Sequence, residues 1–218
     1  MPRPFDLVIF DCDGVLVDSE TISASTLADN LTRIGFPIDR DYVHEHYLGR
    51  SFDVIKADYA HRTGRQLPQD FADAWYRDLF AAFRRDLKPI PGAADVLARL
   101  TIPKCVASSS APARLALSLA VTGLAPLCGD DVFDASMVGR GKPAPDLFLY
   151  CAHRMCAVPA RTLVVEDSIT GIAAAVAAGM TAWAFVGGSH YAGGSDTTPL
   201  RRAGAARIFA SMIEFELN

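Results

Sequence analysis

The stretch LVIFDCDG, residues 7–14, decides the fold. Its first half is a continuous apolar run without alternation, which predicts a strand covered on both faces, as in the middle of a parallel sheet. Asp11 and Asp13 follow at the carboxyl end of that strand, where open α/β sheets bind their ligands. Carboxylates are costly to bury, so this pair indicates a metal ion or a cationic partner. Taken alone, a solvated turn explains the pair equally well.

Further apolar runs repeat this pattern along the chain. Helical segments separate most of them, and this alternation predicts an α/β fold with a doubly wound parallel sheet. Residues 187–198, rich in Gly and Ser, are expected to form a mobile surface loop. The expected strands are 7–10, 104–107, 132–133, 163–165, 182–186 and 207–209, and the expected helices are 92–100, 112–121, 145–155 and 168–178.

One segment interrupts the alternation, because residues 19–88 contain no convincing strand. The sequence therefore predicts two domains: a core formed by residues 1–17 and 89–218, and a small all-helical insert, residues 18–88, placed after the first strand. Helices are expected at 20–34, 42–47, 51–62 and 69–86. Large apolar side chains at helical spacing predict a buried stripe on the last helix, formed by Phe71, Trp75, Leu79 and Phe83 or Ala82.

Composition narrows the classes of function. The chain has 218 residues, 50% of them hydrophobic, and a net charge of -4, without a cluster of Lys and Arg, so we expect no nucleic-acid surface. No apolar run approaches the ~20 residues of a membrane span, and the N-terminus lacks a signal-peptide pattern, so we expect a cytoplasmic protein that contacts no membrane. The expected partner is a small molecule. A monomer is expected, with a dimer as the alternative.

Asp11 and Asp13 suit covalent chemistry on phosphorus. One carboxylate can attack phosphorus, and a second one, two residues away, can protonate the leaving oxygen and then deprotonate water. Gly14 lets the backbone turn sharply after them. Cys12 is an alternative nucleophile, disfavoured because no cation or His adjoins it in sequence to lower its pKa.

Two further segments bring phosphate-binding groups to the same edge of the sheet. Ser108, Ser109 and Ser110 follow the second strand, where they can hold phosphate oxygens. Ser110 also suits an N-cap of the next helix, and the two roles are compatible. Lys142 lies just before a predicted helix that begins with a proline. Its Gly-x-Gly-Lys context lacks the first Gly and the Ser/Thr of a nucleotide-binding P-loop, so we expect a single positive charge in the site instead.

A third carboxylate-bearing strand end completes the pattern. Glu166 and Asp167 follow the apolar run 163–165, and with Asp11 and Asp13 they predict a site of hard oxygen ligands that suits Mg²⁺. Like charges 4 Å apart repel by roughly 4 kcal/mol at an effective dielectric constant of 20. A phosphate dianion would therefore need both a divalent cation and Lys142 in order to bind here.

As a set, these segments resemble the haloacid dehalogenase superfamily, specifically its phosphatases and mutases related to β-phosphoglucomutase. The resemblance rests on FDCDGVLVDSE (10–20), GKPAPD (141–146) and EDSITG (166–171), in this order. It implies a Rossmann-like core with a helical cap, which residues 18–88 match, and a small phosphorylated metabolite as the substrate. Dehalogenases of the superfamily lack the second carboxylate and the metal, so Asp13 and the 166–167 pair indicate phosphoryl transfer.

By matching position, the resemblance implies a role for each motif residue. Asp11 would be the nucleophile and a Mg²⁺ ligand, and Asp13 the general acid and base, whose backbone carbonyl also meets the metal. Ser108 and Lys142 would hold the transferred phosphoryl group.

The remaining motif residues would complete the metal and substrate sites. Asp167 would bind Mg²⁺, and Glu166 would be a further ligand or a partner behind the ligands. Gly14 and Ser109 would lie against the substrate.

Two departures from the mutases favour hydrolysis. Mutases carry a His in the first cap helix where this chain has Ser23, and the expected cap Arg is absent because Phe52 follows Gly49-Arg50-Ser51. We expect a phosphatase acting on a sugar or sugar-acid phosphate, with a β-phosphoglucomutase-like mutase and a non-enzymatic metabolite sensor as alternatives. Arg50 and Arg77 are candidate cap residues for an anionic substrate group, or else exposed structural arginines.

Overall fold

The computed structural model describes residues 4–47, 52–194 and 196–217. The chain divides into two compact units: Met1–Asp18 with Lys88–Asn218, here called the core unit, and Ser19–Leu87, here called the helical unit. The predicted insert, 18–88, differs from the helical unit by one residue at each junction. Its role as a cap stays a prediction.

A six-stranded, fully parallel sheet forms the centre of the core unit. The strand order is β3-β2-β1-β4-β5-β6, so the chain first winds outward from β1 on one side and then returns to wind outward on the other. The predicted doubly wound α/β fold is confirmed, and its switch point lies beside β1, where such sheets bind ligands. The strands are β1 (Leu7–Phe10), β2 (Lys104–Ser108), β3 (Val132–Asp134), β4 (Thr162–Glu166), β5 (Thr181–Phe185) and β6 (Arg207–Phe209).

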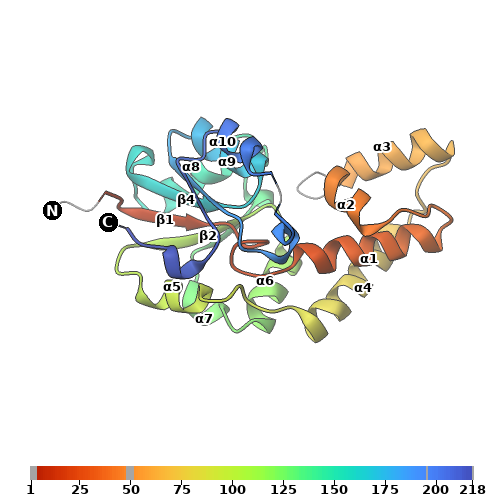
Figure 1. The fold of residues 1–218 in the computed structure, drawn as a ribbon, viewed down its shortest axis with the longest axis horizontal. Helices are drawn as coiled ribbons and strands as arrows, with labels where there is room; N and C mark the ends of the chain where they lie inside the picture. The colour runs from red at the N-terminus through yellow and green to blue at the C-terminus, as the bar shows by residue number, and fades with distance from the viewer. Residues whose placement is uncertain (1–3, 48–51, 195, 218) are drawn as a thin grey trace. The chain divides into compact units, whose positions relative to one another are not determined.

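Helices cover both faces of the sheet (Figure 1). One face carries α5 (Ala93–Arg99), α6 (Pro112–Val121) and α7 (Ala125–Cys128), and the other carries α8 (Asp146–Arg154), α9 (Ile169–Ala177) and α10 (Thr198–Arg202). The sequence did not predict α7 and α10, which are too short to show periodicity. Four 3₁₀ turns are also described, at Ala135–Met137, Pro159–Arg161, Ser189–Tyr191 and Met212–Glu214.

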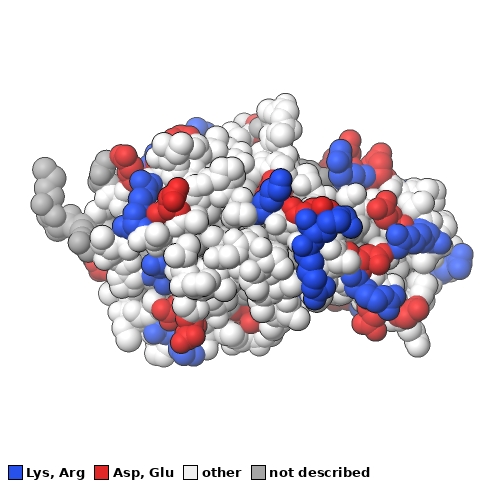
Figure 2. Space-filling view, turned by 90° about the horizontal axis from the view of Figure 1, so that it is seen from below, with Lys and Arg blue, Asp and Glu red and all other residues white. Residues whose placement is uncertain are grey.

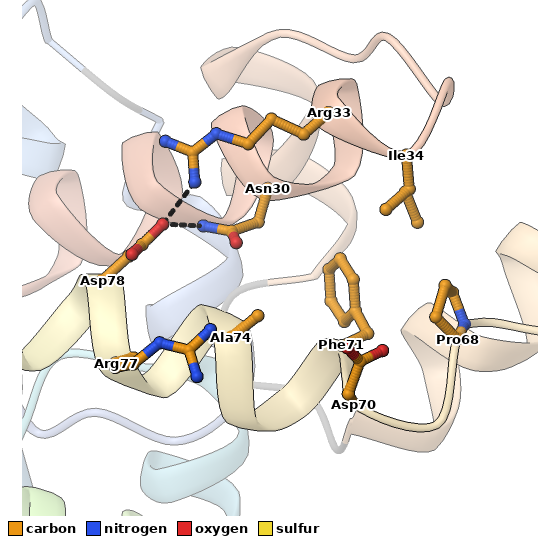
Figure 3. Close-up of a pocket in the computed structure, with 9 residues that line it drawn as sticks. All are labelled: Asn30, Arg33, Ile34, Pro68, Asp70, Phe71, Ala74, Arg77 and Asp78. Atoms are coloured by element: carbon orange, nitrogen blue, oxygen red, sulfur yellow. Dashed lines mark hydrogen bonds and ion pairs between the residues drawn. The ribbon is translucent and has the colours of Figure 1, made fainter.

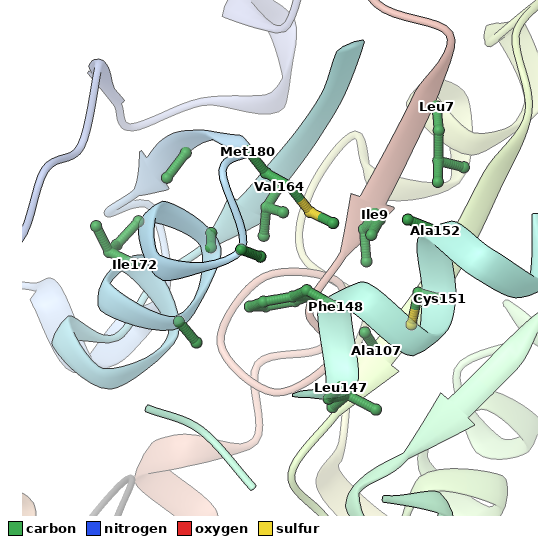
Figure 4. Close-up of a cluster of buried hydrophobic side chains, with 14 of the residues drawn as sticks. Leu7, Ile9, Ala107, Leu147, Phe148, Cys151, Ala152, Val164, Ile172 and Met180 are labelled. Atoms are coloured by element: carbon green, nitrogen blue, oxygen red, sulfur yellow. The ribbon is translucent and has the colours of Figure 1, made fainter. Parts of the chain in front are cut away.

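The apolar run of β1 lies in the middle of the core. All four of its residues are fully buried, because β2 and β4 flank the strand and helices cover both faces. Phe148 of α8 and Ile172 of α9 pack against this sheet in one apolar cluster (Figure 4). This packing holds the carboxyl end of β1 in a fixed place, and Asp11 begins there.

The helical unit contains α1 (Glu20–Arg33), α2 (Arg40–His46), α3 (Phe52–Thr63) and α4 (Phe71–Asp86). Helix α2 begins earlier than predicted because the Asp39 side chain accepts the backbone N–H of Tyr42 at 2.7 Å and caps it. The predicted apolar stripe of α4 is buried.

Charged side chains of both signs lie beside one another on the face of the molecule that Figure 2 draws. Among the described residues, no helix has the length and apolar character that crossing a membrane requires.

Candidate active site

The first loop places Asp11 at the edge of the sheet. Its backbone N–H still donates to the Val165 carbonyl at 2.9 Å, as if β1 continued. The chain then turns, and the Cys12 carbonyl accepts the N–H groups of the residues four and five positions later. Gly14 has a φ of +76°, and a Cβ atom there would lie 1.9 Å from Asp167 Oδ2. A glycine is required at this point because the loop runs directly against the end of β4.

Lys142 joins two of the predicted carboxylates. Its Nζ donates to Asp11 Oδ1 at 2.5 Å, to Glu166 Oε1 at 2.6 Å and to the Ala107 carbonyl at 3.1 Å. The side chain is 4% exposed and lies over the Phe148 ring. An ammonium group has three protons, and each has an acceptor here. Lys142 therefore holds Asp11 in one orientation as well as balancing its charge.

Glu166 is held from both sides. Its Oε1 accepts from Lys142, and its Oε2 accepts from the backbone N–H and hydroxyl of Ser168, both at 2.9 Å. A Cβ atom at Gly171 would lie 1.9 Å from this carboxyl group, so α9 begins in close contact with it. Because both oxygens are engaged, the geometry favours Glu166 as a partner behind the metal ligands over a direct ligand.

Asp13 is fixed by α6 and the turn before it. Ser110 Oγ donates to Asp13 Oδ2 at 2.6 Å, and Arg114 Nη2 donates to Oδ1 at 2.8 Å. Ser108 Oγ lies 3.5 Å from the same carboxylate and accepts the Ser110 N–H. The capping role predicted for Ser110 is wrong, because the N-cap of α6 is Ala111 and has no side-chain cap. Sequence reasoning missed Arg114, whose only signal was its place one turn into a helix that begins at the sheet edge.

Asp167 is contacted by the segment after β5. His190 Nε2 lies 3.0 Å from Asp167 Oδ2, and the Tyr191 hydroxyl donates to the Asp167 carbonyl at 2.5 Å. The prediction of a mobile surface loop is therefore wrong for residues 188–191, which contain a 3₁₀ turn and the largely buried His190 side chain. The sequence showed no partner for His190.

Burial and like charges shape the titration of the site. Burial raises the pKa of Asp11 well above its usual range, and Glu166 and Asp167 add to this effect, whereas Lys142 opposes it. Burial, followed by Glu166, raises the pKa of Asp167 in the same direction. For Lys142, burial lowers the pKa, but contact with Asp11 and Glu166 raises it by more. The net shift is upward, so the side chain keeps its ammonium form. Burial also raises the pKa of Cys12, which disfavours it as a nucleophile.

The remaining predicted residues belong to the exposed loop after β2, to the helical unit, or to the part of the chain outside the described residues. Ser109 is exposed. Arg77 belongs to the helical unit, where it lines a pocket of about 230 Å³ between α1 and α4 (Figure 3). Ser23 is buried, and its hydroxyl donates to the Ser19 carbonyl at 2.8 Å. Arg50 lies outside the described residues.

Asp11 and Asp167 are the carboxylates suited to bind Mg²⁺. Within the described residues, no three Asp, Glu, His or Cys side chains form a group arranged to hold a metal ion. Mg²⁺ does not need such a cage, since it usually keeps several waters and binds one or two carboxylates together with substrate phosphate. Asp11 and Asp167, two buried carboxylates at the ends of the paired strands β1 and β4, fit that requirement.

The chain is similar to known hydrolases. The sequence model of the haloacid dehalogenase-like hydrolases matches residues 5–179. The 6-phosphogluconate phosphatase of Escherichia coli is 27% identical over 190 residues, 85% of this chain and 84% of that protein. The fructose-1-phosphate phosphatase of the same organism is 30% identical over 177 residues, covering 80% and 93%.

A solved structure extends the likeness to the whole fold. It is a haloacid dehalogenase family hydrolase from Deinococcus radiodurans, determined with bound phosphate and sodium. It is 38% identical, with a TM-score of 0.80 over 97% of this chain and 93% of that one.

Proposed function

The chain belongs to the haloacid dehalogenase-like hydrolase family, and we propose that it is a Mg²⁺-dependent phosphatase that hydrolyses a sugar or sugar-acid phosphate through an aspartyl phosphate on Asp11. The predicted family and the predicted class of enzyme, a phosphatase-type hydrolase, are confirmed by the family match and the phosphatase relatives. The substrate, the metal and the mechanism are the proposal.

The proposed mechanism rests on one observation. The buried Lys142 fixes Asp11 at the end of β1, whereas Asp13, two residues later, is held by other side chains. Lys142 contacts Oδ1 of Asp11, which leaves the carboxylate oriented for attack by its other oxygen. Asp13 is held by Ser110 and Arg114 instead. The two carboxyl groups therefore have different environments. Such a difference allows one carboxyl group to act as the nucleophile and the other as the acid and base.

In the first step, Asp11 attacks the phosphorus atom of the substrate. A P–O bond to Asp11 forms as the P–O bond to the leaving alcohol breaks, and Asp13, as a carboxylic acid, gives its proton to the leaving oxygen. Lys142 and the hydroxyl of Ser108 stabilise the negative charge that the phosphoryl oxygens carry.

In the second step, water releases the phosphate. Asp13, now a carboxylate, takes a proton from water while the water oxygen attacks phosphorus and the bond to Asp11 breaks. This proton returns Asp13 to the carboxylic acid form in which the first step began. Asp11 and Asp167 would hold Mg²⁺, which would supply positive charge that stabilises the transferred phosphoryl group.

Hydrolysis is favoured over mutase chemistry by the helical unit. Mutases of this type have a His where this chain has Ser23, and the Ser23 hydroxyl is directed within α1 to the Ser19 carbonyl. No ionisable side chain from this position can help retain a phospho-enzyme for a second sugar hydroxyl.

The class of substrate is proposed from the relatives. Two of them are named for 6-phosphogluconate and fructose 1-phosphate, a sugar-acid phosphate and a sugar phosphate. Both carry one phosphate on a small polyhydroxy chain.

Phosphate release from several dozen phosphorylated metabolites, measured with Mg²⁺ and with EDTA, tests the proposal. We expect sugar or sugar-acid phosphates to lead the ranking, with activity lost in EDTA and restored by Mg²⁺. The Asp11→Asn variant should lose at least about 10⁴-fold in kcat, the scale seen when a nucleophile is removed. Conversion of a hexose 1-phosphate to the 6-phosphate with little phosphate release would contradict hydrolysis in favour of the mutase.

A further inference from the structure

Residues 187–191, here called the strap, hold Asp167 from two directions. His190 approaches its side chain, with Nε2 3.0 Å from Oδ2. Tyr191 approaches its backbone, with the hydroxyl 2.5 Å from the carbonyl oxygen. Both the side chain and the peptide group of one carboxylate residue are thus held by consecutive strap residues.

The strap is itself anchored to the first loop. Asp18 Oδ1 accepts the backbone N–H of Ser189 at 3.0 Å and its hydroxyl at 2.8 Å. Within the strap, the Tyr191 N–H donates to the Gly188 carbonyl at 3.0 Å. The segment that carries Asp11 at its start therefore also sets the position of His190.

Two glycines make room for the imidazole ring. A Cβ atom at Gly188 would lie 2.6 Å from His190 Cε1, and one at Gly14 would lie 3.0 Å from the same atom. The His190 side chain is only 7% exposed and Asp167 only 10%. The ring fits between two stretches of backbone with no space for a larger residue on either side, so its direction toward Asp167 is fixed by packing.

We propose that His190 is a positioning residue for the metal site: its Nε2–H donates to Asp167 Oδ2 and thereby directs Oδ1 toward the cation. The proposal rests on the proposed function, which assigns Asp167 to Mg²⁺. Carboxylates that bind metals are themselves held by hydrogen bonds, and loss of such a partner typically lowers metal affinity by about 10- to 100-fold. The neutral Nε2–H tautomer and the imidazolium both donate this bond, so no particular charge is required.

Direct Mg²⁺ binding to the whole chain, measured by calorimetry without substrate, tests the proposal. His190→Phe keeps a planar ring but removes the donor, and His190→Gln restores an N–H group near the position of Nε2. His153→Phe, on an exposed residue of α8 in the same unit, is the matched control. Urea unfolding of each metal-free variant separates a local effect from loss of the fold.

We expect the dissociation constant for Mg²⁺ to rise about 10- to 100-fold in His190→Phe, to stay near the wild-type value in His190→Gln and to be unchanged in His153→Phe. The Mg²⁺ concentration for half-maximal activity should shift in step. If His190→Phe does not fold, His190→Leu takes its place with the same expectations.

Asp167→Asn separates failure of this proposal from failure of the proposed function. If Asp167→Asn weakens Mg²⁺ binding while the His190 variants bind as the wild type does, the positioning role is wrong and the metal assignment stands. If Asp167→Asn itself binds Mg²⁺ normally, both are wrong.

Discussion

A cluster of charged residues in the core unit and a charged pair in the helical unit differ in their burial. In the core unit, Lys142, Asp11 and Glu166 form one ion-pair cluster whose side chains are between 1% and 9% exposed. In the helical unit, Arg33 pairs with Asp78 at the rim of a pocket, with side chains 65% and 38% exposed (Figure 3). The two clusters contain similar charged groups and differ in how far those groups are removed from water.

This difference indicates where the chemistry lies. Buried charges shift one another's pKa strongly and hold fixed directions, which suits catalysis. Exposed pairs are screened by water and contribute little to stability. The proposed chemistry is therefore assigned to the buried cluster of the core unit.

Removal of Lys142 is expected to give the largest contrast between the units. Lys142→Met leaves Asp11 and Glu166 buried without their cation, and breaking a buried pair costs about 3–5 kcal/mol. The same substitution at Lys56, which pairs with Asp53 on exposed α3, should cost about 0–1 kcal/mol. Urea denaturation of both variants measures the free energies of unfolding. Equal losses would show that burial does not distinguish the two pairs.

The next largest difference is expected between alanine substitutions at Gly14 and Gly64, two glycines with positive φ. Gly14→Ala must adopt a φ of +76° and also displace Asp167, whereas Gly64→Ala, at +67° in the helical unit, has no atom within 4 Å of its new Cβ. The backbone effect costs each variant about 1–2 kcal/mol. Gly14→Ala should lose more stability than this, together with about 100-fold in kcat/KM from the misplaced carboxylate, and Gly64→Ala should keep its activity. Retained activity in Gly14→Ala would contradict the close packing of Gly14 against Asp167.

The smallest effect is expected at the pocket of the helical unit. Arg33→Ala removes the pair with Asp78 but leaves the hydrogen bond from Asn30, 3.1 Å long. The free energy of unfolding should fall by about 0–1 kcal/mol, and by less still in high salt, because the pair is exposed. Urea titrations at low and high NaCl measure this difference. A loss as large as that of Lys142→Met would reverse the comparison.

Local patterns were sufficient to predict the sheet and the order of the motifs. The apolar run 7–10 is buried on both faces, as its lack of alternation indicated. Asp11, Asp13, Lys142 and Glu166 lie at carboxyl ends of strands or in the loops beyond them, and a parallel sheet brings these ends to one edge.

Partners brought in by tertiary folding were not predictable. Arg114 is 101 positions from Asp13, and Tyr191 is 24 positions from the carbonyl it contacts. Nothing in a Gly-rich segment indicates that His190 packs between two backbones. Whether Ser110 caps the helix or contacts the site depends on where Asp13 points, which only the folded loop decides.

A burst experiment on Asp13→Asn tests whether Asp11 forms the covalent intermediate and Asp13 moves the protons. p-Nitrophenol leaves without needing an acid, so this variant should still form the aspartyl phosphate from p-nitrophenyl phosphate, but its hydrolysis should stall. We predict a burst of nitrophenol that matches the amount of protein and a hydroxylamine-sensitive phosphate on the peptide that contains Asp11. Steady turnover with no burst, or phosphate on another residue such as Ser108, would contradict the account.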